Sequence, residues 1–133
     1  MQIRRETDYA IRCVCYLCGK KDGTVAMVDE ISGAMNIPRS FAAKILQKLV
    51  RAGIVASHQG AKGGFRIVRE PASITLFDVV TVIEGPFALN TCMESSEACG
   101  MSAQCMVHPF WFKIRAGVEK LFKELTFDQF IGE

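Results

Sequence analysis

The sequence predicts a mainly helical fold with a small β-wing, that is, a winged helix-turn-helix followed by a long C-terminal helix. Two short helical segments precede a longer basic one, a glycine-rich hairpin follows, and an apolar stripe four turns long lies near the C-terminus. The 133 residues, half of them hydrophobic, suffice for one domain or a small domain with an extension. We expect a winged helix-turn-helix domain over 1–71, and a linker helix, a cysteine-rich loop and a dimerisation helix over 72–133.

Three helices are expected in the first part of the chain, over 8–19, 27–35 and 39–52. Pro38 can occupy the first turn of the third helix, where its missing N–H costs nothing. At helical spacing the apolar residues of this helix fall on one side, namely Ala42, Ile45, Leu46, Leu49 and Val50. Lys44, Lys48 and Arg51 stack on the other side. The first side is therefore expected in the core, and the second forms a cationic surface.

A hairpin is expected directly after this helix, with strands over 54–57 and 65–69. Its connection, HQGAKGG over 58–64, holds three glycines and a lysine, which predict a flexible basic tip. A glycine-rich loop can also cradle a nucleotide phosphate, but this one lacks the spacing and the Lys-Ser/Thr ending of a P-loop. Two short helices, a basic helix and a basic hairpin, in this order, describe a winged helix-turn-helix.

Basic residues are concentrated in the middle of the chain. Residues 36–69 carry seven Lys or Arg and no acid, whereas residues 1–35 are neutral and residues 70–133 carry a net charge of −5. A merely solvated face usually mixes both signs, so the basic segment indicates a polyanion partner. An electron carrier or interaction protein is the competing class, and it would not need this segment. We expect a two-fold homodimer to bind a pseudo-palindromic DNA duplex through the recognition-helix residues Arg39, Ser40, Lys44 and Lys48 and the wing residues Gln59 and Lys62.

The C-terminal part is expected to hold two helices separated by a long loop, and then a last short helix capped at Thr126. Thr75 and Asp78 form a capping box that opens a helix over 75–84. The loop over 86–107 is long enough to be either functional or disordered. The final long helix carries an apolar stripe of Phe110, Ile114, Val118, Leu121 and Leu125. This stripe indicates a dimer interface, with packing on the first helix of the same subunit as the alternative, and the two can coexist.

The six cysteines form two groups. Cys92, Cys99 and Cys105 lie in the polar loop, separated by six and five residues, and His108 follows three residues later. Three soft thiolates in one loop suit either zinc or an iron–sulfur cluster. Zinc sites typically use tighter pairs, so the spacing favours a cluster over zinc, and both over three chance thiols. Cys13, Cys15 and Cys18 lie on the first helix, where we assign them to packing, with a small allowance for redox reactivity.

The sequence predicts a cytoplasmic regulator without enzymatic activity. The N-terminus has no signal-peptide pattern and no stretch reaches the roughly 18 apolar residues of a membrane span. In the cytosol the cysteines are expected to stay reduced. His58 and His108 lie in no nucleophile–base pattern. A thiol-based oxidoreductase is the enzymatic alternative, but the one Cys-x-x-Cys, Cys15 to Cys18, lies inside an apolar helix.

The chain resembles the IscR/NsrR/RirA-type regulators, also called the Rrf-two family. The resemblance rests on TDYAIR over 7–12, on GIV over 53–55 leading into the GAKGG wing, and on the cysteine triplet. It covers nearly the whole chain, including FDVV over 77–80. The resemblance implies a dimeric transcription factor, usually a repressor, whose DNA affinity depends on a 2Fe–2S or 4Fe–4S cluster. Iron, oxidants or nitric oxide are the signals that it implies.

Carried over by position, the resemblance makes Cys92, Cys99 and Cys105 the cluster ligands. His108 matches the fourth ligand of IscR, whereas Asp8 matches that of NsrR, where an aspartate reaches the cluster from the other subunit. We favour His108, because imidazole is a precedented replacement for thiolate on a cluster iron. The chain departs from its relatives at Gln59, where the wing usually carries arginine, and at Ala43, where IscR has glutamate. One extra residue between Cys92 and Cys99 leaves the cluster type open.

Overall fold

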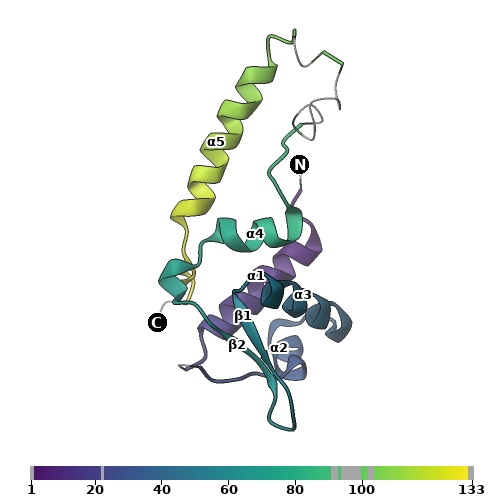
Figure 1. Ribbon diagram of the computed structural model, residues 1–133, viewed down its shortest axis with the longest axis vertical. Coiled ribbons are helices and arrows are strands. Elements are labelled where there is room, and N and C mark those ends of the chain that lie inside the picture. Colours follow the sequence, from purple (N-terminus) through teal and green to yellow (C-terminus); the bar gives the residue numbers. More distant parts are fainter. Residues whose placement is uncertain (1, 22, 91–92, 94–99, 102–103, 132–133) are drawn as a thin grey trace.

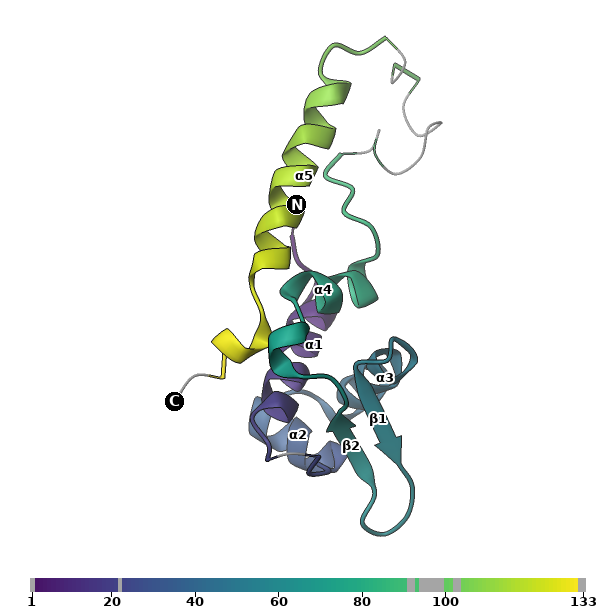
Figure 2. The ribbon, with the colours of Figure 1, turned by 60° about the vertical axis from the view of Figure 1, so that its left-hand side comes forward.

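The structure is a computed structural model that describes residues 2–21, 23–90, 93, 100–101 and 104–131 (Figure 1). In chain order the elements are α1 (Arg5–Cys18), α2 (Val28–Met35), α3 (Arg39–Arg51), β1 (Val55–His58), β2 (Gly64–Ile67), the 3-10 turn η1 (Pro71–Ser73), α4 (Leu76–Glu84), α5 (His108–Glu124) and the 3-10 turn η3 (Phe127–Gln129). The predicted mainly helical fold with a small wing and a long C-terminal helix is confirmed. Figure 2 shows α5 extending away from the winged part.

The core lies where α1 and α3 cross beneath α4. The predicted inner side of α3 is confirmed, because Ala42, Ile45, Leu46 and Leu49 are all fully buried and Val50 is partly buried against them. They pack with the inner residues of the neighbouring elements, which are Ala10, Cys13, Val14 and Leu17 of α1, Ile31 of α2 and Val79 of α4. Burying this many aliphatic side chains is the main force that holds the three helices together.

The wing is a two-stranded antiparallel hairpin in which Val55 pairs with Ile67 and His58 with Gly64. The strands lie within two residues of their predicted positions. Two backbone hydrogen bonds of 2.8 Å between Ala26 and Phe65 tie the wing to the segment before α2. Gly64 is required at this crossing, because its φ is +151° and a Cβ there would lie 2.4 Å from the Ala26 carbonyl oxygen.

Helix α4 begins at the predicted capping box. The Thr75 hydroxyl accepts from the Asp78 amide, and the Asp78 carboxylate accepts from the Thr75 amide, both at 3.0 Å. The end of α5 returns to this point, because the Leu76 amide donates to Leu125 and the Phe127 amide donates to Ile74. The completely buried Phe127 side chain anchors this return in the core.

Helix α1 begins at Arg5, three residues before its predicted start, and its first turn is fixed by contacts with α4. Helix α5 packs loosely by comparison. No residue of α5 is buried, and the side chains of Phe110 and Leu121 are 60% and 63% exposed. No helix in the described parts of the chain is long and apolar enough to cross a membrane.

We expect Phe127→Ala to lower the free energy of unfolding by about 3–5 kcal/mol, because it leaves a cavity where the end of α5 joins the core. Phe130→Ala is the matched control, since Phe130 packs edge-on to the same ring but is 40% exposed. Its effect should be much smaller. Urea unfolding at one fixed protomer concentration measures both. Equal losses in the two variants would contradict the role given to Phe127.

Candidate nucleic-acid interface and metal centre

The outward side of α3 presents one row of polar residues. Ser40, Lys44, Gln47 and Arg51 are all exposed and follow one another at spacings of four, three and four residues. They lie opposite the buried side of the helix, and within the described part of the chain neither Lys44 nor Arg51 forms an ion pair. This row can donate to phosphates and to base edges. Gln47 was missing from the predicted set, although its helical phase, three residues after Lys44 and four before Arg51, would have found it.

The other two predicted residues of α3 lie on its flanks, and each is paired with an acid. Arg39 Nε lies 2.5 Å from an Asp29 carboxylate oxygen on α2, and both side chains are about two-thirds exposed. Lys48 Nζ lies 2.6 Å from a Glu6 carboxylate oxygen on α1, at a half-buried position. These acids come from other helices, so the pairing could not be foreseen from the basic segment alone.

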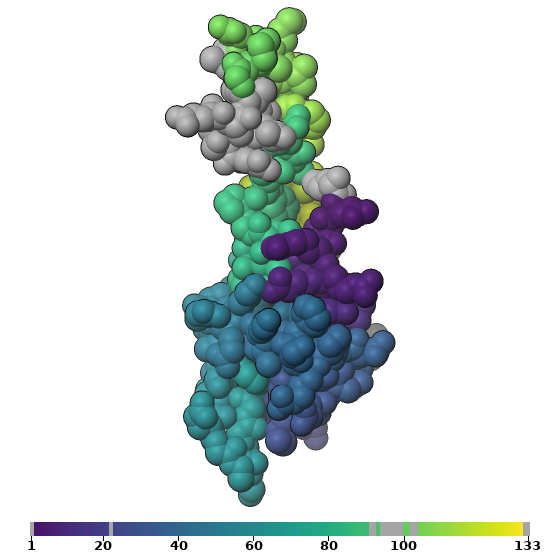
Figure 3. Space-filling model, turned by 90° about the vertical axis from the view of Figure 1, so that its right-hand side faces the viewer, coloured from purple at the N-terminus to yellow at the C-terminus, as the bar shows by residue number. Residues whose placement is uncertain are grey.

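The wing extends from the same end of the molecule as α3 (Figure 3). Gln59 and Lys62, the two predicted wing residues, are both exposed near its tip. Arg66 Nε donates to His58 Nε2 at 2.8 Å across the two strands, which places a further cation on the wing. Wing and recognition helix therefore offer donors to one partner surface at one end of the protein.

The structure describes two of the four predicted metal ligands. Cys92 and Cys99 lie outside the described residues, whereas Cys105 is half-buried before α5 and His108 is the first residue of that helix. His108 Nδ1 is buried and has no hydrogen-bond partner among the described residues. Its ring packs edge-on to Phe112, with 4.9 Å between the centroids. Where the chain is described, no three His, Cys, Asp or Glu side chains come together as a metal site.

The side chains of Cys105 and His108 nevertheless fit the expected iron–sulfur cluster or zinc ion. A buried ring nitrogen without a partner is unfavourable unless something binds it, and a neutral imidazole can coordinate a metal ion. Thiolate and imidazole are ligands that both zinc and iron–sulfur clusters accept. Asp8, the alternative ligand, is exposed on α1 and forms an ion pair with Arg12 at 2.6 Å. Of the two candidates, only His108 has a potential ligating atom without a partner among the described residues.

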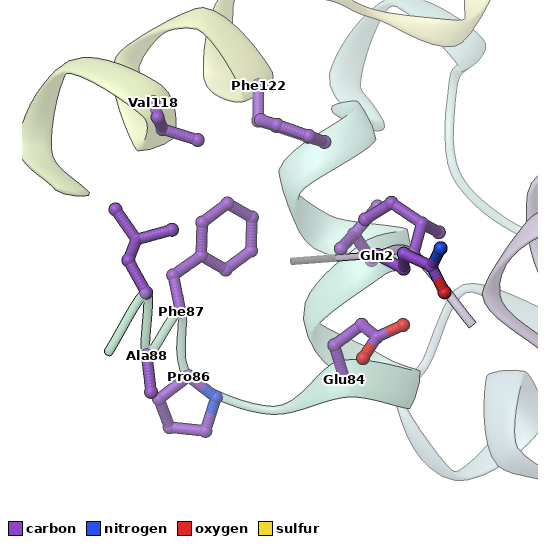
Figure 4. Close-up of a pocket in the computed structure, with 10 residues that line it drawn as sticks. Gln2, Glu84, Pro86, Phe87, Ala88, Val118 and Phe122 are labelled. Carbon is purple, nitrogen blue, oxygen red and sulfur yellow. The ribbon is translucent and has the colours of Figure 1, made fainter. Parts of the chain in front are cut away.

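The start of the cysteine segment is held between α4 and α5 (Figure 4). The Phe87 ring lies edge-on to Phe122 of α5, at 5.1 Å between centroids, and 5.5 Å from the Phe77 ring of α4. Beside it, a cleft of about 360 Å³ is lined by Val118 and by the N-terminal residues before α1. Phe87, near the start of the loop over 86–107, therefore contacts both helices.

Glu84 connects this region to the winged part. Its carboxylate accepts from the Arg4 amide at 3.0 Å, from Arg4 Nε at 3.2 Å and from the Thr7 hydroxyl at 2.5 Å. Thr7 is fully buried. Partial burial opposes ionisation, but the hydrogen bonds from Thr7 and Arg4 hold the pKa of Glu84 below its usual value. The end of α4 and the start of α1 are thus joined by a charged, satisfied carboxylate.

Two cysteines of α1 lie in the core, where burial affects their ionisation. Cys13 and Cys18 are buried, and burial raises the pKa of each thiol to about 12, with the nearby Cys15 adding to the shift at Cys18. Reactive dithiols need the opposite shift, because the thiolate is the nucleophile. The predicted assignment of these residues to packing agrees with their burial.

Comparison with known proteins adds the wider context. The Rrf2 family, described as iron-dependent transcriptional regulators, matches residues 3–133. Protein aau3 of Rhizobium meliloti is 38% identical over 77% of this chain and 71% of its own. A protein of Aquifex aeolicus, named as an HTH-type transcriptional regulator, is 31% identical over 93% of this chain and 87% of its own.

Solved structures share the fold. CymR, the global cysteine regulator of B. subtilis, has a TM-score of 0.78 at 24% identity, over 98% of this chain and 96% of its own. The T. potens IscR has a TM-score of 0.77 at 18% identity, over 98% of this chain and 86% of its own.

The raised thiol pKa values make a testable prediction. In the native, metal-free protein at about pH 8, iodoacetamide should leave Cys13 and Cys18 unmodified, because burial keeps them as protonated thiols. Half-exposed Cys105 should react and serves as the internal comparison. Urea should expose all of them to labelling. Mass spectrometry of the peptides reads each site, and rapid native labelling of Cys13 or Cys18 would contradict the assignment.

Proposed function

The chain belongs to the Rrf2 family of iron-dependent transcriptional regulators, and from this premise we propose that an iron–sulfur cluster on Cys92, Cys99, Cys105 and His108 controls its DNA affinity. As a member of this family, the chain is a DNA-binding regulator and not an enzyme. The observation that carries the proposal is the buried Nδ1 of His108, three residues after Cys105, which has no partner in the part of the chain that the structure describes. A 2Fe–2S or 4Fe–4S cluster would supply a ligand for this nitrogen and respond to iron, oxidants or nitric oxide.

On DNA, the recognition helix α3 lies in the major groove and the wing lies against the backbone. Ser40, Lys44, Gln47 and Arg51 form the central row, with Arg39 and Lys48 on its flanks. Gln59 and Lys62 are the wing contacts. A cytoplasmic homodimer presents two such surfaces, so its operator is a pseudo-palindrome with half-sites about one helical turn, or a multiple, apart. We expect repression from such a site.

The dimer forms through α5. Its apolar residues Phe110, Ile114 and Leu121 are exposed in the single chain, and a stripe of this kind normally contacts a partner. The two parts, 1–71 and 72–133, then have separate tasks: the first binds DNA, and the second sets the distance between the two copies of the first. The cysteine segment lies between α4 and α5, so ordering it around a cluster changes that distance.

Structural zinc is the alternative occupant, because the same thiolates and imidazole suit it. Zinc does not change its oxidation state, so the bound metal itself would carry no redox signal in a zinc protein. Metal analysis separates the two cases.

We expect Lys44→Glu to weaken binding to duplexes that the wild-type protein selects from a random library. The substitution replaces a cation facing phosphates with an anion, so affinity should fall across sequences and the salt dependence should flatten by about one to two counterions. Lys21→Glu, an exposed residue in the turn after α1, is the control with the same charge change. Fluorescence anisotropy over a salt series measures both. Identical salt slopes for wild type and Lys44→Glu would exclude Lys44 from the interface.

We expect anaerobically purified protein to be coloured and to contain iron and acid-labile sulfide. His108→Ala should reduce cluster retention, because it removes the fourth ligand, whereas Asp8→Ala should leave it unchanged. Visible absorption with iron, sulfide and zinc analysis gives the readout. A colourless protein with zinc in place of iron would contradict the cluster proposal, and loss of the cluster in Asp8→Ala alone would make Asp8 the ligand.

A further inference from the structure

Arg39 has an unusual partner for the first residue of a recognition helix. Its Nε donates to Asp29 Oδ1 at 2.5 Å, and Asp29 belongs to the first turn of α2. The two side chains are 66% and 67% exposed, so the pair lies at the surface. An exposed ion pair of this kind contributes little to stability. A carboxylate near the DNA-binding face also repels phosphates, which makes it unfavourable there unless it has another task.

The geometry of the pair indicates that task. The carboxylate contacts Nε of the Arg39 guanidinium. The two terminal nitrogens, Nη1 and Nη2, lie on another edge of the group and have no partner among the described residues. Two parallel N–H donors on this edge match the O6 and N7 acceptors of guanine in the major groove. A lysine could not do this, because an ammonium has no planar fork. Lys48 shows the contrast, since its ammonium is directed at Glu6 and its position is half-buried.

We propose that Arg39 reads a guanine in each half-site and that Asp29 is the positioning residue that aims it. The inference rests on the proposed placement of α3 in the major groove. It adds the base that Arg39 contacts and the residue, Asp29, that holds Arg39 in position. Residues at the start of a recognition helix are the ones that reach base edges. Holding the guanidinium in one orientation before binding reduces the rotamer freedom that is lost when the contact forms.

A positioning role and a merely electrostatic role predict different results for Asp29→Asn. Removal of a negative charge near the phosphates should strengthen binding to unrelated DNA. If Asp29 also aims Arg39, the same substitution should weaken discrimination at one base pair per half-site. A positioning role of Asp29 therefore predicts that Asp29→Asn gains non-specific affinity and loses specificity.

The test starts with a random duplex library and the whole 133-residue chain, in anaerobic and in metal-free preparations. Wild-type protein should enrich an inverted repeat with a G·C pair at one fixed position in each half-site. Replacement of that pair in the enriched duplex should weaken wild-type binding roughly 5- to 150-fold. Arg39→Ala and Arg39→Lys should lose this preference and keep the preferences at other positions. Asp29→Asn should reduce the preference several-fold while binding unrelated duplexes more tightly.

Glu30→Gln is the matched control, because it makes the same charge change one residue away but removes a carboxylate that contacts Tyr16 and Lys20. It should raise non-specific affinity without changing base preference. An unchanged preference in Arg39→Ala would overturn the assignment of Arg39. The role of Asp29 would be overturned if Arg39→Ala lost the base preference while Asp29→Asn and Glu30→Gln had the same base preference and the same affinity for unrelated duplexes. If the wild-type protein enriches no motif at all, the proposed operator recognition fails as well.

Discussion

Glu84 joins the last turn of α4 to the first turn of α1, and the arrangement of the molecule depends on this joint. Its carboxylate is satisfied by Arg4 and Thr7, at a position where an unpaired charge would be costly. On one side of the joint lie the recognition helix and the wing. On the other side, directly after Glu84, begins the segment that leads to the cysteines and packs between α4 and α5. We therefore expect movement in that segment to reach the DNA-binding end through α4, which contacts the winged part both at this joint and through the buried side chain of Val79.

The sequence predicts the elements well because their signals are local. The helical phase of α3, the capping box at Thr75 and the glycines of the wing each operate within a few residues, and the structure has all three. What it could not predict are contacts between distant residues. Glu84 lies 80 residues from Arg4, and Glu6 lies 42 from Lys48. Such pairings depend on how the helices cross, which periodicity does not specify.

The same holds for the predicted functional residues: local signals found some of them, and contacts between distant residues decide the surroundings of the others. Charge identified the basic helix and wing, but the contacts of α3 with α1 and α2 are needed to separate the exposed row with Gln47 from Arg39 and Lys48, which are paired with acids. The structure adds the environment of the described cysteines, which spacing alone does not give. Burial raises the thiol pKa of Cys13 and Cys18, whereas Cys105 lies just before a helix whose first residue, His108, has a ring nitrogen without a partner among the described residues. The ligand role of the loop thiols rests on the resemblance and on this nitrogen.

The central claim is that the state of the cluster is communicated to the recognition helices. One anaerobic preparation, divided into cluster-loaded and cluster-free samples, tests it most directly when both are titrated against the same selected duplex at one salt concentration. The account predicts that the two dissociation constants differ by roughly 5- to 150-fold, the range of typical allosteric coupling. Equal dissociation constants for the two samples would contradict it.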